Sequence, residues 1–216
     1  MASIYIHIPF CKQACHYCNF HFSTSLKNKK AIVDAISLEL SLKSNGFSET
    51  IDSIYFGGGT PSLLDINDFD ILLNKIHKKY SISGSLEITV ECNPDDICEN
   101  KLIELKKMSI NRLSIGVQSF VDEELKLMNR SHDSNIALES ISKSKNLFEN
   151  ISIDLMYGLP NSNLKNWEFN LNTTDQFNLN HISAYAITVE PKTALESYVK
   201  KQIIKMPDDD FVHSQF

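Results

Sequence analysis

Short apolar runs alternate with longer amphipathic stretches along the 216-residue chain, and this alternation constrains the fold more than any other feature. The short runs are rich in Ile, Val, Tyr and Phe, which is typical of buried strands. The longer stretches repeat their apolar residues every three or four positions, which is typical of helices. Strands are predicted over residues 3–8, 53–56, 86–91, 111–117, 151–156 and 181–188. Helices are predicted near 28–44, 67–80, 99–108, 121–128, 134–148, 164–178 and 192–203.

A strand followed by a helix, repeated six times, predicts parallel strands joined by crossover helices. Eight such units close a complete barrel. Six units therefore predict an α/β fold of the open kind, a partial (β/α)6 TIM-like barrel. One core domain is expected over residues 1–205, and residues 206–216 are expected to form a connector without a terminal element of their own.

Three of the five cysteines form a cluster near the N-terminus, at Cys11, Cys15 and Cys18. They follow the first predicted strand, which Pro9 ends, so they are expected on a loop at the end of that strand. A disulfide would leave one thiol over, and a structural zinc site would need a fourth ligand, such as His7, His16 or His21. An iron–sulfur cluster suits three thiolates on one short loop and leaves one iron open for chemistry. On spacing alone these alternatives, and inert thiols, stay open.

Polar and glycine-rich residues follow the other predicted strands, at the end where barrels of this kind collect their chemistry. The second strand is followed at once by Gly57-Gly58-Gly59-Thr60-Pro61, and the third ends at Glu91. The fourth leads into Gln118, the fifth contains Asp154, and the sixth contains Tyr185. Charged groups inside apolar runs are costly to bury without partners, so these residues are expected to share one site. Consecutive glycines leave their backbone amides unshielded, so a ligand can approach them closely.

Composition narrows the class of protein. A net charge of −6 argues against a nucleic-acid partner, because phosphate binding requires a basic face. No apolar run approaches the roughly 20 residues that span a bilayer, so no integral membrane segment is expected. The chain shows no export signal, and free thiols require a reducing interior, so a cytoplasmic location is predicted.

The cysteine spacing, with Tyr17 directly before Cys18, resembles the signature of the radical S-adenosylmethionine (SAM) superfamily. The longer string Tyr5-Ile6-His7-Ile8-Pro9-Phe10-Cys11 resembles one branch of it, which contains oxygen-independent coproporphyrinogen III oxidase and a related family of heme chaperones. The resemblance extends from Tyr5 to about Pro191 and implies a radical SAM core over residues 1–205. It also implies a [4Fe-4S] cluster and SAM as cofactors.

This resemblance implies roles for particular residues. The clustered cysteines would hold three irons, and SAM would bind the fourth through its amino and carboxylate groups. The family's contacts to SAM correspond here to Tyr5, Tyr17, Gly58, Gly59, Thr60, Glu91, Gln118, Arg130 and Asp154. Without the family, Arg130 would be interpreted as a surface arginine after a helix. The family's chemistry is reductive cleavage of SAM to methionine and a 5′-deoxyadenosyl radical, while the protein orients SAM and excludes water. Cys92 and Cys98 match no family ligand and are predicted to be structural thiols.

Within the branch, the resemblance favours the heme chaperones, which bind heme and hand it to acceptor proteins. The oxidases carry a further cysteine two places after the third, where this chain has Phe20, and a longer segment before the first strand. The chaperones' C-terminal marker, a His-Asn-x-x-Tyr-Trp string, does not occur, and the only tryptophan is Trp167, so a C-terminal truncation is expected. The expected partners are heme or a porphyrinogen, heme-acceptor proteins and an electron donor. The alternative function is oxidative decarboxylation of coproporphyrinogen III.

Overall fold

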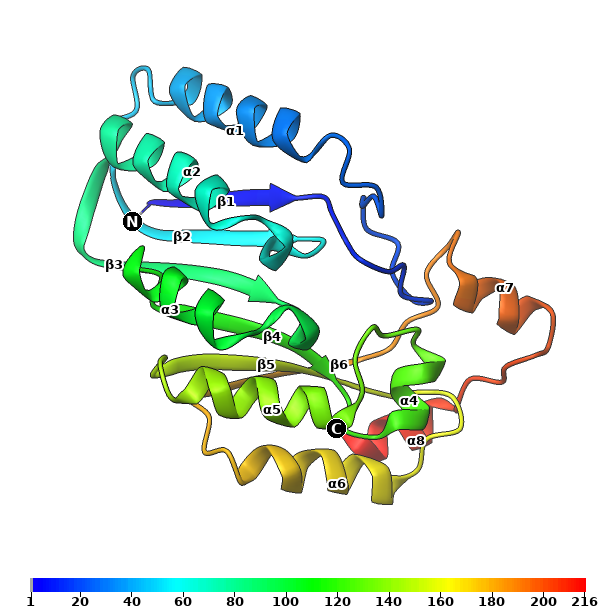
Figure 1. Ribbon diagram of the computed structural model, residues 1–216. Coiled ribbons are helices and arrows are strands. Elements are labelled where there is room, and N and C mark those ends of the chain that lie inside the picture. The colour runs from blue at the N-terminus through cyan, green and yellow to red at the C-terminus, as the bar shows by residue number, and fades with distance from the viewer. Residues whose placement is uncertain (1) are drawn as a thin grey trace.

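The computed structural model describes residues 2–216, in which strands and helices alternate along the chain (Figure 1). The strands are β1 (Ala2–Ile8), β2 (Thr50–Gly58), β3 (Ser81–Cys92), β4 (Arg112–Gln118), β5 (Asn150–Tyr157) and β6 (His181–Ala186). The helices are α1 (Lys29–Lys43), α2 (Ile66–Lys79), α3 (Glu99–Lys107), α4 (Asp122–Leu127), α5 (Ser134–Lys145), α6 (Leu164–Asp175), α7 (Ala194–Lys200) and α8 (Asp209–Gln215). Short 3-10 turns, η1 (Pro61–Leu63) and η2 (Pro94–Asp96), follow β2 and β3. Every predicted strand and helix is present, although β3 begins well before its predicted start at residue 86.

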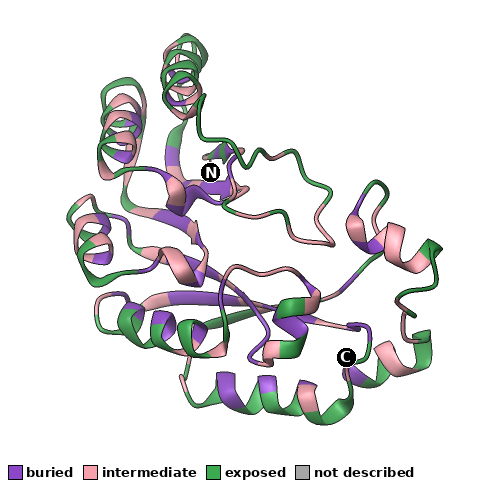
Figure 2. Cartoon of the chain, turned by 45° about the vertical axis from the view of Figure 1, so that its right-hand side comes forward, coloured by how far each residue is buried: buried purple, intermediate pink, exposed green. Residues whose placement is uncertain are grey.

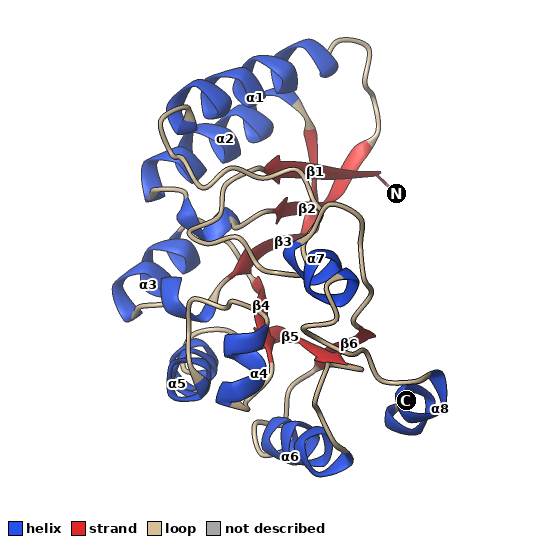
Figure 3. Ribbon diagram, turned by 90° about the vertical axis from the view of Figure 1, so that its right-hand side faces the viewer, coloured by secondary structure: helices blue, strands red, loops and turns tan. Residues whose placement is uncertain are grey.

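Every strand pairing in the sheet is parallel, and the strand order follows the chain from β1 to β6. Figure 3 shows the strands in an arc, with α1, α2, α3, α5 and α6 around its outer side. Within residues 2–216, β1 and β6 are the two free edges and do not pair with each other. The predicted open (β/α)6 barrel is therefore confirmed, and its topology places all the C-terminal strand ends at one mouth.

The main apolar core lies between the sheet and the outer helices, as the buried segments in Figure 2 show. In β1 the side chains of Ile6 and Ile8 are buried, while the neighbouring Tyr5 and His7 are exposed. Phe56 of β2 packs edge-on against Phe69 of α2, with 5.1 Å between ring centroids and no exposed surface on either side chain. Each such burial contributes roughly 1.5–3 kcal/mol, so packing against the helices holds the strand ends in place.

Aspartates start several of the helices. Asp133 accepts a hydrogen bond from the Ile136 N–H at 2.9 Å at the start of α5. Ahead of α2, the Asp65 N–H donates to Asp68 Oδ2 at 3.0 Å. Such caps satisfy backbone donors that have no partner inside the helix. Across residues 2–216, no helix combines the length and the apolar character that crossing a membrane requires.

The prediction that residues 206–216 lack a terminal element is wrong, because residues 209–215 form helix α8. Asp208 caps this helix by accepting from the Phe211 N–H at 2.9 Å, and acidic residues occupy its first turn, where the helix dipole favours them. Trp167 Nε1 donates to the Gln215 carbonyl at 2.6 Å, and the Gly158 N–H donates to Gln215 Oε1 at 2.8 Å. The segment is therefore packed against α6 and the end of β5. The division into a core and a connector stays a prediction.

Candidate functional site

One cavity of about 390 Å³ opens at the C-terminal ends of the strands, and segments from all six strands or directly after them form its wall. All the residues predicted for the site line this cavity: Tyr5, Cys11, Cys15, Tyr17, Cys18, Gly58, Gly59, Thr60, Glu91, Gln118, Arg130 and Asp154. The fold thus brings the predicted set together from across the chain. The roles of these residues in binding remain predictions.

The loop that carries the three cysteines follows β1 and is attached to distant parts of the chain. The Cys11 N–H donates to the Ser23 carbonyl at 3.1 Å, which closes the base of the loop. Further along, the His16 N–H donates to the Met128 carbonyl at 3.1 Å, and the His16 carbonyl accepts from the Leu195 N–H at 2.8 Å. All three thiols are half-buried. Burial raises the pKa of the Cys11 thiol, so deprotonation there requires a positive charge or a metal nearby.

The glycine turn after β2 lies directly against this loop. The Gly59 N–H donates to the Ile8 carbonyl at 2.9 Å. A Cβ on Gly59 would lie 2.6 Å from the Phe10 carbonyl oxygen and 3.0 Å from Cys11 Sγ. Gly58 has a φ of +116°, a conformation that side chains other than hydrogen rarely adopt. Glycine is therefore required at Gly58 by the backbone conformation, and at Gly59 because the turn and the cysteine loop share the same space.

Two carboxylates lie in the cavity wall. Glu91 accepts a hydrogen bond from Tyr55 Oη at 2.8 Å and another from the Gly58 N–H at 3.1 Å. Burial raises the pKa of Glu91, and these two hydrogen bonds offset part of that shift. Burial also raises the pKa of Asp154, despite the polar Ser183 beside it. Carboxylates held in such surroundings are suited to accept hydrogen bonds from a polar or cationic ligand.

Arg130 forms part of the cavity wall and is not the surface residue that the sequence alone would suggest. Its guanidinium donates to the Gly116 carbonyl at 2.7 Å, to Asn93 Oδ1 at 2.8 Å and to Cys15 Sγ at 3.3 Å. Burial alone lowers the pKa of Arg130, but the neighbouring Tyr17 and Cys15 outweigh it and raise the pKa overall. Its buried Nε atom has no hydrogen-bond partner within the described chain. A buried N–H without a partner is costly, and a bound acceptor would satisfy it.

The end of β4 adds a strained residue to the site. Gln118 has a φ of +71°, which is unfavourable for a side chain larger than glycine and is typical of functional sites. This backbone turn places Gln118 Oε1 where Tyr185 Oη donates to it at 3.1 Å. Burial raises the pKa of Tyr185 to about 12, so this phenol stays a neutral donor. Together the two side chains form a fixed polar edge on the β6 side of the cavity.

The donors around the cavity fit a thiolate-bound cluster with SAM beside it. Among residues 2–216, no three His, Cys, Asp or Glu side chains converge as ligands of a single ion. A four-iron cluster does not require such convergence, because each thiolate binds a different iron. Three half-buried thiols and Arg130 line the same cavity, and Gly59 lies beside Cys11 in its wall. When bound, such a cluster would supply one electron to SAM, and these residues would hold and orient the two groups.

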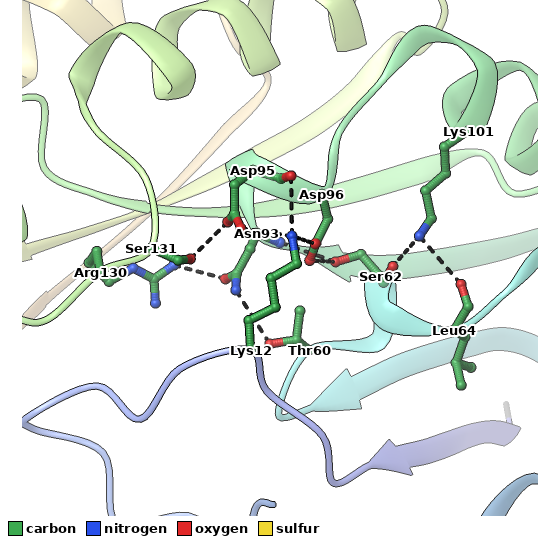
Figure 4. A network of polar contacts seen from close by, with 10 residues as sticks. All are labelled: Lys12, Thr60, Ser62, Leu64, Asn93, Asp95, Asp96, Lys101, Arg130 and Ser131. Atoms are coloured by element: carbon green, nitrogen blue, oxygen red, sulfur yellow. Dashed lines mark hydrogen bonds and ion pairs between the residues drawn. The ribbon is translucent and has the colours of Figure 1, made fainter. Parts of the chain in front are cut away.

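A polar network beside the cavity was not predicted (Figure 4). Lys12 Nζ lies 2.8 Å from Asp95 Oδ2 and also pairs with Asp96. Ser131 Oγ donates to Asp95 Oδ1 at 2.9 Å, and Ser62 Oγ donates to Asp96 Oδ2 at 2.7 Å. The sequence did contain one indication of this network: Asp95 and Asp96 come shortly after β3, just as other site residues follow their strands.

Further side chains line the cavity besides the predicted set. They include His7, Gln13, Phe20, Phe22, Cys92, Asn93 and Ser114. Cys92 is buried, and burial raises its pKa to about 12, as expected of a structural thiol. Cys98 is exposed and lies just before α3, so the prediction of a structural thiol does not fit it.

An open parallel barrel with three cysteines at its mouth defines the class of protein. The sequence model of the Radical SAM superfamily matches residues 5–172. The chain therefore belongs to the radical SAM superfamily. The predicted cofactors, a [4Fe-4S] cluster and SAM, are confirmed as those of this family.

Comparison with individual relatives indicates the branch. The chain is 39% identical to the heme chaperone HemW of Buchnera aphidicola subsp. Acyrthosiphon pisum, over 97% of this chain and 56% of that protein. It is 36% identical to the heme chaperone HemW of Bacillus subtilis, again over 97% of this chain and 56% of that protein. In structure it resembles the coproporphyrinogen III oxidase HemN of Escherichia coli, a radical SAM enzyme, with a TM-score of 0.86 and 26% identity over 99% of this chain and 50% of that one. The chain thus spans about half the length of these relatives, and the predicted resemblance to the heme-chaperone branch is confirmed.

Proposed function

We propose that this chain is the cluster- and SAM-binding core of a heme chaperone, a protein that binds heme and transfers it to acceptor proteins. One observation carries the proposal: identity to two HemW heme chaperones is 39% and 36%, against 26% to the oxidase HemN. Phe20 supports it, because the oxidases of the branch have a cysteine at that position. The whole protein's partners would then be heme, an acceptor protein and an electron donor, in a cytoplasmic setting.

In this proposal some cavity residues hold the cluster and others hold SAM. Cys11, Cys15 and Cys18 hold the cluster. Arg130 lines the cavity and has a buried Nε–H without a protein partner, and a guanidinium suits the carboxylate of SAM. Glu91 offers carboxylate oxygens to the amino group, and the Gly58–Gly59 backbone lets the methionine end of SAM come close. The half-buried position of the thiols limits access of water to the cluster.

The second candidate function is oxidative decarboxylation of coproporphyrinogen III. The observation that favours it is the likeness in structure to HemN, at a TM-score of 0.86. Both functions use a tetrapyrrole and the same cofactors, so the two differ in whether the tetrapyrrole is carried or converted.

Two assays on the anaerobically reconstituted whole protein separate these functions. Heme titration followed by visible absorbance should show saturable binding, and the bound heme should pass to a heme-free globin used as an acceptor. Coproporphyrinogen III incubated with SAM and a reductant should remain unconverted. Conversion to a decarboxylated porphyrin would overturn the chaperone proposal, and the absence of both binding and conversion would overturn both candidates. Cys15→Ala serves as the control for the cluster, since it should lower the iron bound per chain.

A further inference from the structure

Lys12 connects the cysteine loop to the turn after β3. It directly follows Cys11, and its ammonium lies 2.8 Å from Asp95 Oδ2, pairs with Asp96 and donates to the Asp95 carbonyl at 3.3 Å. The Lys12 side chain is 41% exposed, but those of Asp95 and Asp96 are only 14% and 4% exposed. Partly buried pairs of this kind hold geometry better than exposed ion pairs, which contribute little.

The same turn also contacts the other walls of the cavity (Figure 4). Asn93 Oδ1 accepts from Arg130 Nη2 at 2.8 Å, and Asn93 Nδ2 donates to Thr60 Oγ1 at 3.4 Å. Arg130 in turn donates to Cys15 Sγ at 3.3 Å. The turn from Asn93 to Asp96 therefore joins the cysteine loop, the glycine turn and the arginine of the cavity wall.

The ion pairs of Lys12 hold the start of the cysteine loop, whereas the side-chain contacts of Gln13 and His16 hold its later part. Gln13 Nε2 donates to Asn129 Oδ1 at 2.8 Å, and His16 Nδ1 contacts the Leu127 carbonyl at 2.9 Å. Both of these contacts lead to the end of α4 and lie beyond Lys12 in the loop. Around Cys11 itself, the backbone bond to Ser23, the close packing of the Gly59 turn and the Lys12 side chain fix its position.

We propose that Lys12 is a positioning residue, which acts through Asp95 and Asp96 to hold Cys11 where it binds the cluster. The inference rests on the superfamily's cluster and does not depend on heme transfer. Its consequence is that this ion pair limits how readily the loop opens and releases iron.

The test compares two variants that break the pair with one that breaks an ordinary surface pair. Lys12→Met and Asp95→Asn remove one partner each. Lys143→Met is the matched control, because Lys143 lies at the same 2.8 Å from Glu139 on the exposed face of α5. Reconstituted protein is mixed anaerobically with an iron chelator, and the rate of iron loss is followed. Hydrogen exchange of residues 11–19 is measured on the cluster-free chain, so that one readout needs no bound metal.

If Lys12 positions Cys11, Lys12→Met and Asp95→Asn should lose iron several-fold faster and show faster hydrogen exchange in the loop. Lys143→Met should have the same rates as the unmodified protein. The double variant should lose iron no faster than Lys12→Met, because that single variant already removes the pairs with both Asp95 and Asp96. Lys12→Arg should retain most of the parent behaviour. If Lys12 acted only through its charge, the two single variants would shift the cluster's reduction potential in opposite directions and leave loop exchange unchanged, and that result would overturn the proposal. Because no readout uses heme, failure of the chaperone assay leaves this test intact.

Discussion

Replacing Gly59 by alanine tests whether the glycine turn and the cysteine loop occupy one shared space. The added Cβ would lie 2.6 Å from the Phe10 carbonyl oxygen, and an ordinary contact begins at 3.4 Å, so one of the two segments must move by about 0.8 Å. The turn cannot easily retreat, because the Gly59 N–H is bonded to the Ile8 carbonyl at 2.9 Å. The loop must therefore move, and Cys11 Sγ, 3.0 Å from the new Cβ, must move with it.

Overpacking of this kind costs about 1–3 kcal/mol, so Gly59→Ala should lower the midpoint of urea unfolding of the cluster-free chain. It should also reduce the iron bound per chain after anaerobic reconstitution, because Cys11 leaves its place. Gly84→Ala is the matched control, since a Cβ there meets no atom within 4 Å and the backbone φ is ordinary. If Gly59→Ala bound as much iron as Gly84→Ala and unfolded at the same urea concentration, the shared-space reasoning would be refuted.

Three further predictions concern buried polar groups. Burial and the charge of Arg130 lower the pKa of His132 from 6.5 to about 4, so folding stability present above pH 6.5 should fall by roughly 3 kcal/mol as the pH drops toward 4. Urea unfolding at pH 7 and pH 4.5 should show this slope, and His132→Gln should flatten it; an equal slope in both proteins would contradict the assignment. Because burial raises the pKa of Asp154, Asp154→Asn should raise the melting temperature at pH 7 without SAM and weaken SAM binding in calorimetry, and a lower melting temperature would contradict this. Arg130→Lys should lower the free energy of unfolding by roughly 1.5–3 kcal/mol for each charge-assisted hydrogen bond lost to Asn93 and Gly116. An unchanged midpoint of urea unfolding would contradict this prediction.

The fold was predictable because the patterns that specify its strands and helices lie within short stretches of sequence. The strand and helix periods can be counted in short windows, and strand order then follows from the repeated crossover. The site followed from the fold, because parallel strands deliver Glu91, Gln118 and Asp154 to the same mouth. The identity of the cofactors followed from the cysteine spacing only through the family resemblance, since zinc, disulfide and cluster remained open on spacing alone.

What was missed depends on contacts between distant positions. Lys12 and Asp95 are 83 residues apart, and no sequence period links the two members of an ion pair. Helix α8 was missed because its aspartates resemble a solvated linker, whereas Trp167, 48 residues earlier, holds Gln215 against the core. Arg130 looks like a surface residue until the fold encloses its guanidinium.

Within residues 2–216 the sheet ends in strands that are paired on one side only, and at the β6 end Ile182 is 41% exposed and Tyr185 is 42% exposed. A bare strand margin offers a row of unpaired amides and carbonyls to any extended peptide that meets it. An uncovered margin of this kind therefore favours pairing between copies of the chain.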